Sequence, residues 1–356
     1  MAELYDAFLN LTRMINITEP VLQGMLIAAI LAISIYLTLY TGMFALANAG
    51  FMAIGAYVAV LLTQQAGWSL FPAMLVAMLV AGVIAIPIGL PVLRLSDIYL
   101  AIATLGFAEV VRVMLLNFDN IAVSIIEWML ASGNQAWVDA IMTFSENSEI
   151  LEIRQLTTRT RISFELIEGA RGVKGIPVLA ETWMLALFIL LLIVFLIRLH
   201  RSRFGRAMAA IRQDETAAAN MGINVVYIKN VVFVMSAMIA AAAGGFEGHL
   251  NRIIEPGAFG FSRNVDILAY AVLGGTQSIA GPIIGGMTLK GLPEVLRQVQ
   301  EYRGLLTGIV LLGAIVYLPN GLVDPEGFKG LWRSLLEWRS PAQQAEDSIE
   351  ERSDTP

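Results

Sequence analysis

From Pro20 to Leu93 the chain runs for 74 residues without one Asp, Glu, Lys, Arg or His. Soluble domains carry a charged residue at about one position in four, so an ordinary soluble domain does not contain such a stretch. A hydrocarbon layer about 30 Å thick is crossed by roughly 20 apolar residues in a helix. The stretch therefore predicts about three membrane-spanning helices and makes the lipid bilayer the solvent of this chain.

The composition of the whole chain agrees, with 57% hydrophobic and only 15% charged residues. Backbone polar groups in lipid must be paired within the chain, so the spans must be helices or a closed barrel. The apolar runs lack the alternation that barrel strands show. We predict an all-α fold, a polytopic membrane helical bundle with about eight to ten transmembrane segments, some of them broken by Gly or Pro. Transport is the first function that such a chain indicates.

Hydropathy and charge divide the chain into segments. We expect apolar segments at 21–40, 43–63, 70–93, 98–116, 182–199, 228–248 and 304–319, with two short or discontinuous segments within 264–300. The predicted parts are an N-terminal segment 1–19, a transmembrane domain 20–322 with a polar excursion 117–181 and a basic loop 200–227, and a polar, partly disordered tail 323–356. Because short loops rich in Lys and Arg stay cytoplasmic, the basic loop and the tail are predicted in the cytoplasm and the excursion on the outer side.

The basic loop carries the most informative polar sequence of the chain. Its first part is Ala-rich and predicts a short helix. Asp214 and Glu215 are placed to begin a second short helix, because acidic residues suit a helix N-terminus, and Gly222 is placed to cap its end. Small residues on such a helix would let another protein approach the backbone closely. The alternative is an ordinary basic loop that only sets topology.

This loop resembles the coupling segment of the LivM-type permease subunits of branched-chain amino acid ABC transporters. In that family a Gly-Arg-Ala, an Ile-Arg, an acidic pair and an Ala-rich stretch ending in Gly-Ile dock on a separate ATPase subunit. The matching residues here are Gly205, Arg206, Ala207, Ile211, Arg212, Asp214, Glu215, Ala217, Ala218, Gly222 and Ile223. Three further stretches resemble the family in order, at 46–57, 93–112 and 272–322.

The resemblance implies a permease that builds the translocation path of an ATP-driven importer in the bacterial inner (plasma) membrane. The implied partners are a second related permease subunit, two cytoplasmic ATPase subunits, an extracytoplasmic substrate-binding protein and membrane lipid. The implied cargo is a branched-chain or neutral amino acid, with urea or a short amide as the alternative. No Lys of this chain follows a Gly, so the phosphate-binding G-x-x-x-x-G-K-[ST] loop is absent. We therefore expect no cofactor on this chain and ATP use by the partner subunits.

Candidate residues for the translocation path are Asn48, Gly50, Glu109, Arg112, Gly274 and Gly275. Glu109 and Arg112 lie three residues apart and share a helix face. Charges inside a span usually face the bundle interior and pair, so a structural ion pair is the alternative to a path role. The glycines predict either a broken helix along the path or tight helix packing. Lys290 and Glu294 allow the same two interpretations, and Pro293 between them argues against a continuous helix.

Other classes of function lack their residues. The chain has no Cys, and its two His lie on different segments, so no metal site is expected. The H-E-x-x-H and G-x-S-x-G motifs are absent, so we expect no catalytic residues and no enzyme. The net charge of −6 argues against a nucleic-acid partner. An ion-coupled secondary transporter, with Glu109 and Asp266 as the coupling carboxylates, stays open as a second class of transport protein.

Overall fold

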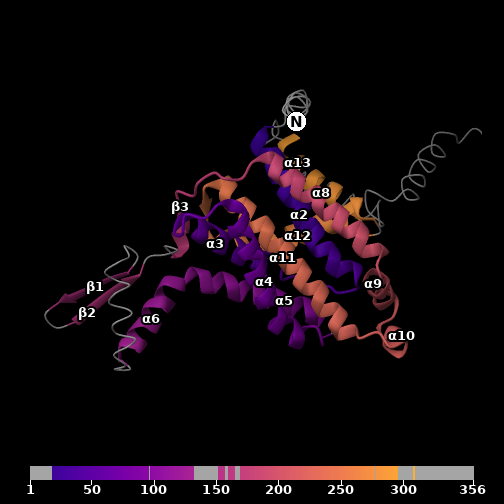
Figure 1. The fold of residues 1–356 in the computed structure, drawn as a ribbon, viewed down its shortest axis with the longest axis horizontal. Helices are drawn as coiled ribbons and strands as arrows, with labels where there is room; N and C mark the ends of the chain where they lie inside the picture. The colour runs from indigo at the N-terminus through magenta and orange to yellow at the C-terminus, as the bar shows by residue number, and fades with distance from the viewer. Residues whose placement is uncertain are drawn as a thin grey trace, which may run out of the picture.

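The computed structural model describes residues 18–95, 97–131, 151–156, 159–164, 169–276, 278–295 and residue 308. The helices of this part are α2 (Glu19–Tyr40), α3 (Asn48–Gln64), α4 (Leu70–Val92), α5 (Asp97–Leu116), α6 (Phe118–Ala131), α8 (Thr182–Arg201), α9 (Arg203–Gln213), α10 (Glu215–Asn220), α11 (Val225–Asn251), α12 (Phe261–Gly274) and α13 (Ala280–Val295), shown in Figure 1. The predicted span 304–319, the tail 323–356 and nearly all of the segment 1–19 lie outside the described residues.

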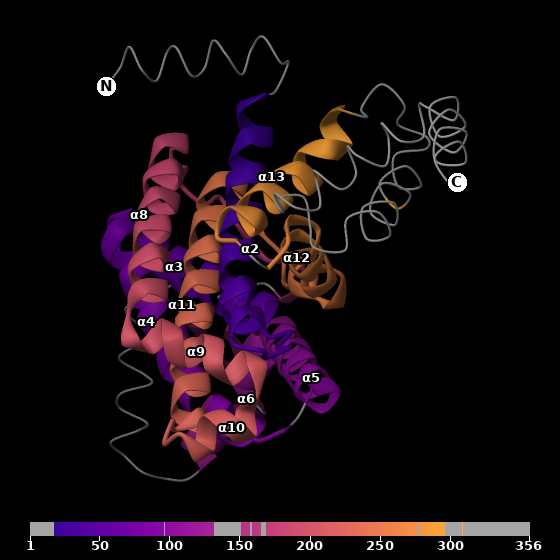
Figure 2. The same cartoon turned by 90° about the vertical axis from the view of Figure 1, so that its right-hand side faces the viewer.

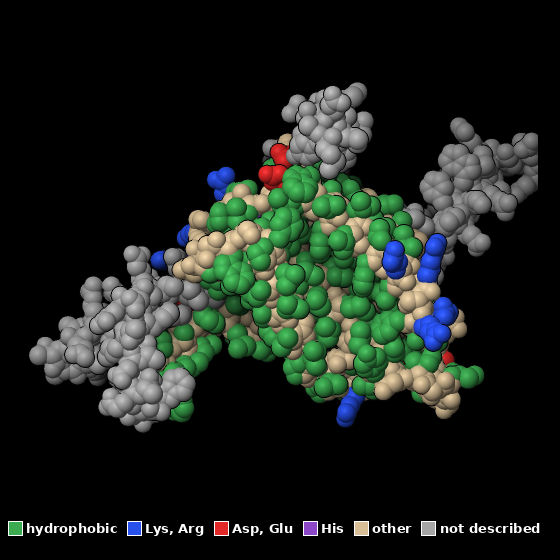
Figure 3. All heavy atoms as spheres, viewed as in Figure 1, with side chains coloured by type: hydrophobic (Ala, Val, Ile, Leu, Met, Phe, Trp, Pro, Cys, Tyr) green, Lys and Arg blue, Asp and Glu red, His purple; other side chains and the backbone are tan. Residues whose placement is uncertain are grey.

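Five of the described helices are long and apolar enough to cross a membrane, namely α2, α4, α5, α8 and α11. They confirm the predicted polytopic helical bundle, and α12 and α13 are the two short segments expected within 264–300. Figure 3 shows a face covered mainly by hydrophobic side chains, with Lys and Arg at its edges, several of them on the side where α9 and α10 lie. An apolar face with charged side chains at its edges is what a bilayer requires of a membrane protein.

Helix α11 lies in the middle of the bundle, alongside α2, α3 and α4 (Figure 2). Its close approach to α3 depends on small residues. A Cβ built on Gly55 would overlap the backbone of Ala241, and one built on Gly244 would overlap the carbonyl group of Met52. Because glycines stand at the contact, the two backbones pack directly against each other. Helices in a membrane associate through such close packing, since lipid tails are as apolar as the side chains and no hydrophobic effect drives the helices together.

Helix α3 begins in the middle of the bundle. The hydrophobic segment predicted over 43–63 is helical only from Asn48, because its first five residues are not helical and follow a turn at Gly42 with a φ of 81°. The N–H of Leu46 donates to Thr104 Oγ1 at 2.8 Å, and the N–H of Ala49 donates to Asn264 Oδ1 at 3.0 Å. Non-helical backbone is tolerated at this depth because buried side chains satisfy its polar groups.

The excursion 117–181 contains strands that the sequence did not predict. Strand β1 (Leu151–Leu156) pairs antiparallel with β2 (Arg159–Phe164), and Figure 1 shows this hairpin and α6 projecting from the bundle. Strand β3 (Val173–Lys174) pairs with β4 (Ile253–Ile254), directly after α11. The second pair joins the end of the excursion to the C-terminal end of α11.

Candidate functional site

Helix α9 starts where α8 ends, at the end of the bundle that bears the Arg residues (Figure 2). Ser202 separates the two helices, and its Oγ accepts the N–H of Gly205 at 3.1 Å. A Cβ built on Gly205 would overlap the carbonyl oxygen of Leu199 and lie 2.7 Å from His200 Cα. Only glycine therefore allows α9 to turn so closely against the last turn of α8.

Helix α10 confirms the predicted second short helix. Asp214 Oδ1 accepts the N–H groups of Thr216 and Ala217, at 2.8 and 3.0 Å, and so caps the N-terminus. At the other end Gly222 has a φ of 83°, and the Ile223 N–H donates to the carbonyl of Ala218 at 3.1 Å. This is the glycine-dependent helix end that Gly222 was predicted to supply.

The predicted coupling residues point in different directions. Gly205, Ile211 and Ala218 are buried against this chain's own helices. The exposed members are Arg206, Asp214, Glu215, Ala217 and Gly222, while Ala207, Arg212 and Ile223 are half-buried. The expectation that small residues form a free docking face is therefore wrong at Gly205 and Ala218, because they are small to fit against neighbouring helices.

The exposed surface of this segment includes residues that the sequence analysis missed. Met221 is 85% exposed, although it is a long apolar side chain beside a helix-capping glycine. Arg203 is exposed on α9, like Arg206. The available sequence signal was a long apolar residue next to a capping glycine in an otherwise charged loop.

Contacts tie α9 and α10 to the membrane helices. The guanidinium of Arg212 donates to the Thr276 carbonyl at 3.4 Å and to its Oγ1 at 3.3 Å, and it lies 5.9 Å from the ring centre of Tyr40. The buried Lys229 of α11 forms an ion pair with Glu215 of α10. These contacts join α9–α10 to α2, to the α12–α13 connection and to α11.

Asn48 lies in a buried hydrogen-bond network and is only 3% exposed. Its Nδ2 donates to Ser34 Oγ on α2 at 2.8 Å and to Ser236 Oγ on α11 at 3.1 Å. Gly50 faces α5, where a Cβ would lie 2.9 Å from Ala108 Cα. Both predicted path residues thus lie where α3 packs on its neighbours.

Glu109 and Arg112 pair as predicted, with Arg112 Nε donating to Glu109 Oε1 at 2.9 Å and Nη2 contacting the same oxygen. The side chains are 42% and 28% exposed on the surface of α5. A Cβ built on Gly260, at the start of α12, would lie 3.3 Å from Arg112 Cδ. Charged side chains within a membrane span usually face protein or a water-filled cavity, so this side of α5 is a candidate for such a surface.

The glycines between α12 and α13 pack the two helices tightly. A Cβ on Gly274 would lie 2.8 Å from Pro282 N and would overlap Gly281, while one on Gly285 would lie 2.6 Å from Gly274 Cα. Gly275 has a φ of 90° and ends α12. The doubt about a continuous helix at Pro293 was wrong, since α13 runs through it to its end.

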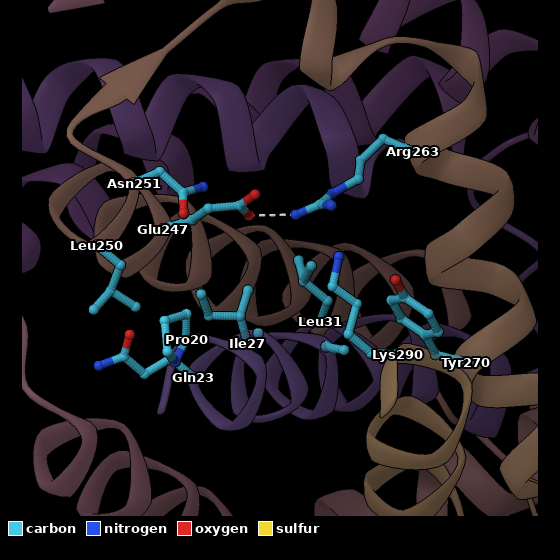
Figure 4. Close-up of a pocket in the computed structure, with 12 residues that line it drawn as sticks. Pro20, Gln23, Ile27, Leu31, Glu247, Leu250, Asn251, Arg263, Tyr270 and Lys290 are labelled. Atoms are coloured by element: carbon cyan, nitrogen blue, oxygen red, sulfur yellow. Dashed lines mark hydrogen bonds and ion pairs between the residues drawn. The ribbon is translucent and has the colours of Figure 1, made fainter. Parts of the chain in front are cut away.

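A cavity of about 240 Å³ lies between α2, α11, α12 and α13 (Figure 4). Glu247 of α11 and Arg263 of α12 form an ion pair on its wall, with side chains 18% and 15% exposed. Tyr270 and Lys290 also line the cavity. Of these four residues, only Lys290 was a candidate from the sequence. The signal for the others was a single charged residue within or next to an apolar segment, as at Glu247 and Arg263. Within the described residues, no three His, Cys, Asp or Glu side chains gather as a metal site would need.

The comparisons with known proteins point to one family. Residues 17–315 match the family described as branched-chain amino acid transport system, permease component. The chain is 30% identical over 286 residues to the high-affinity branched-chain amino acid transport system permease protein LivM of Escherichia coli K12, which is 80% of this chain and 64% of LivM. The chain thus spans less than two thirds of that relative.

Two further similarities cover less of the chain. LivH of the same Escherichia coli strain is 33% identical over 147 residues, which is 40% of this chain and 46% of LivH. BraD of Pseudomonas aeruginosa, a high-affinity branched-chain amino acid transport system permease protein, is 28% identical over 187 residues, 51% of this chain and 60% of BraD. No solved structure matches.

Proposed function

Because the chain belongs to the family of branched-chain amino acid transport permease components, we propose that it is a membrane-spanning subunit of an ATP-driven importer for branched-chain or other neutral amino acids. The family match over residues 17–315 carries the proposal. The helical bundle supports the proposal because it can form the walls of a translocation path. The two capped helices α9 and α10 support it because they form a rigid segment on which an ATPase subunit could act.

In this proposal α9–α10 docks on cytoplasmic ATPase subunits that bind and hydrolyse ATP. The exposed Arg203, Arg206 and Met221 offer charged and apolar contacts to such a partner. The contacts of Arg212 with Thr276 and of Lys229 with Glu215 would pass a displacement of this segment into the membrane helices. Only contacts that differ between two states of the transporter can drive alternating access, so the docking face must move with the nucleotide state.

The remaining parts of the importer belong to the same proposal. A second related permease would complete the path, an extracytoplasmic binding protein would deliver the cargo, and the assembly would lie in the bacterial inner membrane. Glu109 and Arg112 are candidates for the side that faces the path or the second permease, because they are exposed at membrane depth. Asn48, Gly50, Gly274 and Gly275 support the walls through packing.

The test is ATP-dependent uptake of labelled leucine by the purified complex in proteoliposomes, comparing wild type with Arg206→Glu combined with Met221→Asp. Both residues are exposed, so the variant should still insert and fold. We expect loss of the ATPase subunits on purification and at least a tenfold fall in uptake. Arg94→Glu is the matched control, because Arg94 is also exposed at the end of a membrane helix but lies outside α9–α10.

Three results would count against the proposal. Normal uptake by the double variant would remove the docking role of α9–α10. Transport of urea or a short amide, with no leucine uptake, would change the cargo. Uptake that needs a proton or sodium gradient and no ATPase subunit would favour the ion-coupled transporter, with Glu109 and Asp266 as its coupling carboxylates.

A further inference from the structure

The cavity in Figure 4 lies in the half of the bundle away from α9–α10. It is lined by the first turns of α2, from Pro20 to Leu31, and by the last turn of α11, with Leu250 and Asn251. Helix α11 begins next to α10 and ends at the other side, and Figure 2 shows the start of α2 at the end opposite α9 and α10. With the basic segment in the cytoplasm, the cavity belongs to the outer half of the protein.

The polar groups of the cavity have unused bonding capacity. Arg263 contacts Glu247 through Nη2, while its Nε is buried and has no hydrogen-bond partner. Lys290 and Tyr270 form no hydrogen bond or ion pair with the residues that the structure describes. In Figure 4 the Lys290 ammonium and the Tyr270 hydroxyl extend into the same space as the Glu247–Arg263 pair.

A purely structural role accounts for only part of this arrangement. Glu247 and Arg263 already neutralise each other, so the ion pair alone satisfies the packing of α11 against α12. Lys290 adds a second cation, which forms no ion pair with the described residues, although Asp266 of α12 is near enough to attract both Lys290 and Arg263. The cavity wall itself carries one carboxylate, two cations and a hydroxyl, which match the two charged ends of an amino acid.

We propose that this cavity binds the charged ends of a zwitterionic amino acid on its way through the outer half of the transporter. The cargo carboxylate would contact Lys290 Nζ and the Tyr270 hydroxyl, with Arg263 beside them, and the cargo ammonium would contact Glu247. The site rests on the proposed function, since it names where that importer holds its cargo. Its volume of about 240 Å³ is below the roughly 300–1,000 Å³ of pockets for drug-sized ligands and suits a small solute.

Apolar residues complete the site. Ile27 and Leu31 of α2 and Leu250 of α11 line the same cavity. They would contact the hydrocarbon side chain of the cargo, while the charged groups hold its common end. Such a site would accept several amino acids, because they have the same charged ends and differ only in their apolar side chains.

The test uses Lys290→Cys in this chain, which has no Cys of its own, within the assembled transporter in proteoliposomes. Leucine uptake should fall about tenfold. Aminoethyl methanethiosulfonate should then restore it, because the Cys thiolate attacks the sulfenyl sulfur, methanesulfinate leaves, and the new disulfide carries an ammonium close to the original position. Methyl methanethiosulfonate adds no charge and should not restore uptake. Bound leucine should slow the modification several-fold.

Lys174→Cys is the matched control, because Lys174 is an exposed lysine on the outer side, on β3. It should keep wild-type uptake, and leucine should not slow its modification. Uptake at the wild-type level in Lys290→Cys, or modification of that Cys at the same rate with and without leucine, overturns the site. An absence of ATP-dependent leucine uptake by the wild-type complex would instead overturn the proposed function.

A second variant tests the site in case the Lys290→Cys complex does not assemble. Tyr270→Phe removes one hydroxyl and keeps the ring that packs between α12 and its neighbours. The site predicts a KM for leucine raised several-fold in the assembled complex. An unchanged KM in a normally assembled Tyr270→Phe complex also overturns the site.

Discussion

Two adjacent glycines in α11 test the packing that holds the bundle together. A Cβ on Gly244 would overlap the carbonyl group of Met52 and lie 3.0 Å from Ala56 N, both in the backbone of α3. A Cβ on Gly245 would lie 3.3 Å from Ala59 Cβ and 3.4 Å from Met74 Cγ, which are side-chain atoms. Gly244→Ala must push α3 and α11 apart because its Cβ would overlap the backbone of α3, whereas Gly245→Ala needs a shift of only a few tenths of an ångström.

The expected magnitude follows from two opposing terms. Replacing Gly by Ala inside a helix favours folding by up to about 1 kcal/mol, equally at both positions. Overpacking a tight contact costs about 1–3 kcal/mol and applies at Gly244. Because the helix-propensity term cancels between the variants, Gly244→Ala should be about 1–3 kcal/mol less stable than Gly245→Ala.

The assay is unfolding of the purified chain in mixed micelles by increasing mole fractions of sodium dodecyl sulfate, followed by circular dichroism. Gly245→Ala should match or exceed the stability of the wild type, and Gly244→Ala should unfold at a lower detergent fraction. Equal stabilities of the two variants, within about 0.5 kcal/mol, would refute backbone contact between α3 and α11 as the reason for the glycines.

Two further predictions concern α10. Glu215→Gln leaves the buried Lys229 without its counter-charge and should destabilise the chain by about 1–2 kcal/mol in thermal unfolding. This is less than the roughly 3–5 kcal/mol for breaking a fully buried pair, because Glu215 is half exposed. Adding Lys229→Met should recover the lost stability, and no recovery would contradict the pairing. Asp214→Ala removes a helix cap that contributes about 0.5–2 kcal/mol, so the backbone amides of Thr216 and Ala217 should exchange hydrogen about 2- to 30-fold faster. Asp214→Asn keeps an oxygen that can accept these hydrogen bonds and should leave the exchange slow. Exchange rates unchanged by Asp214→Ala would contradict the cap.

The bundle and the coupling helices could be predicted because their signals are local. A span is recognised from its own apolar composition, so α2, α4 and α5 were predicted to within a few residues. The α10 cap was also predicted, since Asp214 bonds to amides two and three residues away. Local chemistry of this kind depends little on what the rest of the chain does.

The direction in which small residues face was not predictable. Gly205 and Ala218 are as compatible with a free docking surface as with internal packing when only their size is known. The structure packs Gly205 against the last turn of α8 and buries Ala218, while Arg206 and Met221 are among the exposed residues of the segment. Burial is a property of the neighbours that a residue acquires on folding.

By itself the sequence determined that the chain lies in a membrane as a helical bundle, which end is basic, and which family it resembles, because hydropathy, charge and motif order are written along the chain. Only the tertiary structure decided that α3 starts at Asn48, since Ala49 finds its hydrogen-bond partner in Asn264, 215 residues away. It also decided that Glu247, Arg263 and Lys290 share one cavity. Three helices must pack together before those charges meet, and no spacing in the sequence encodes that contact.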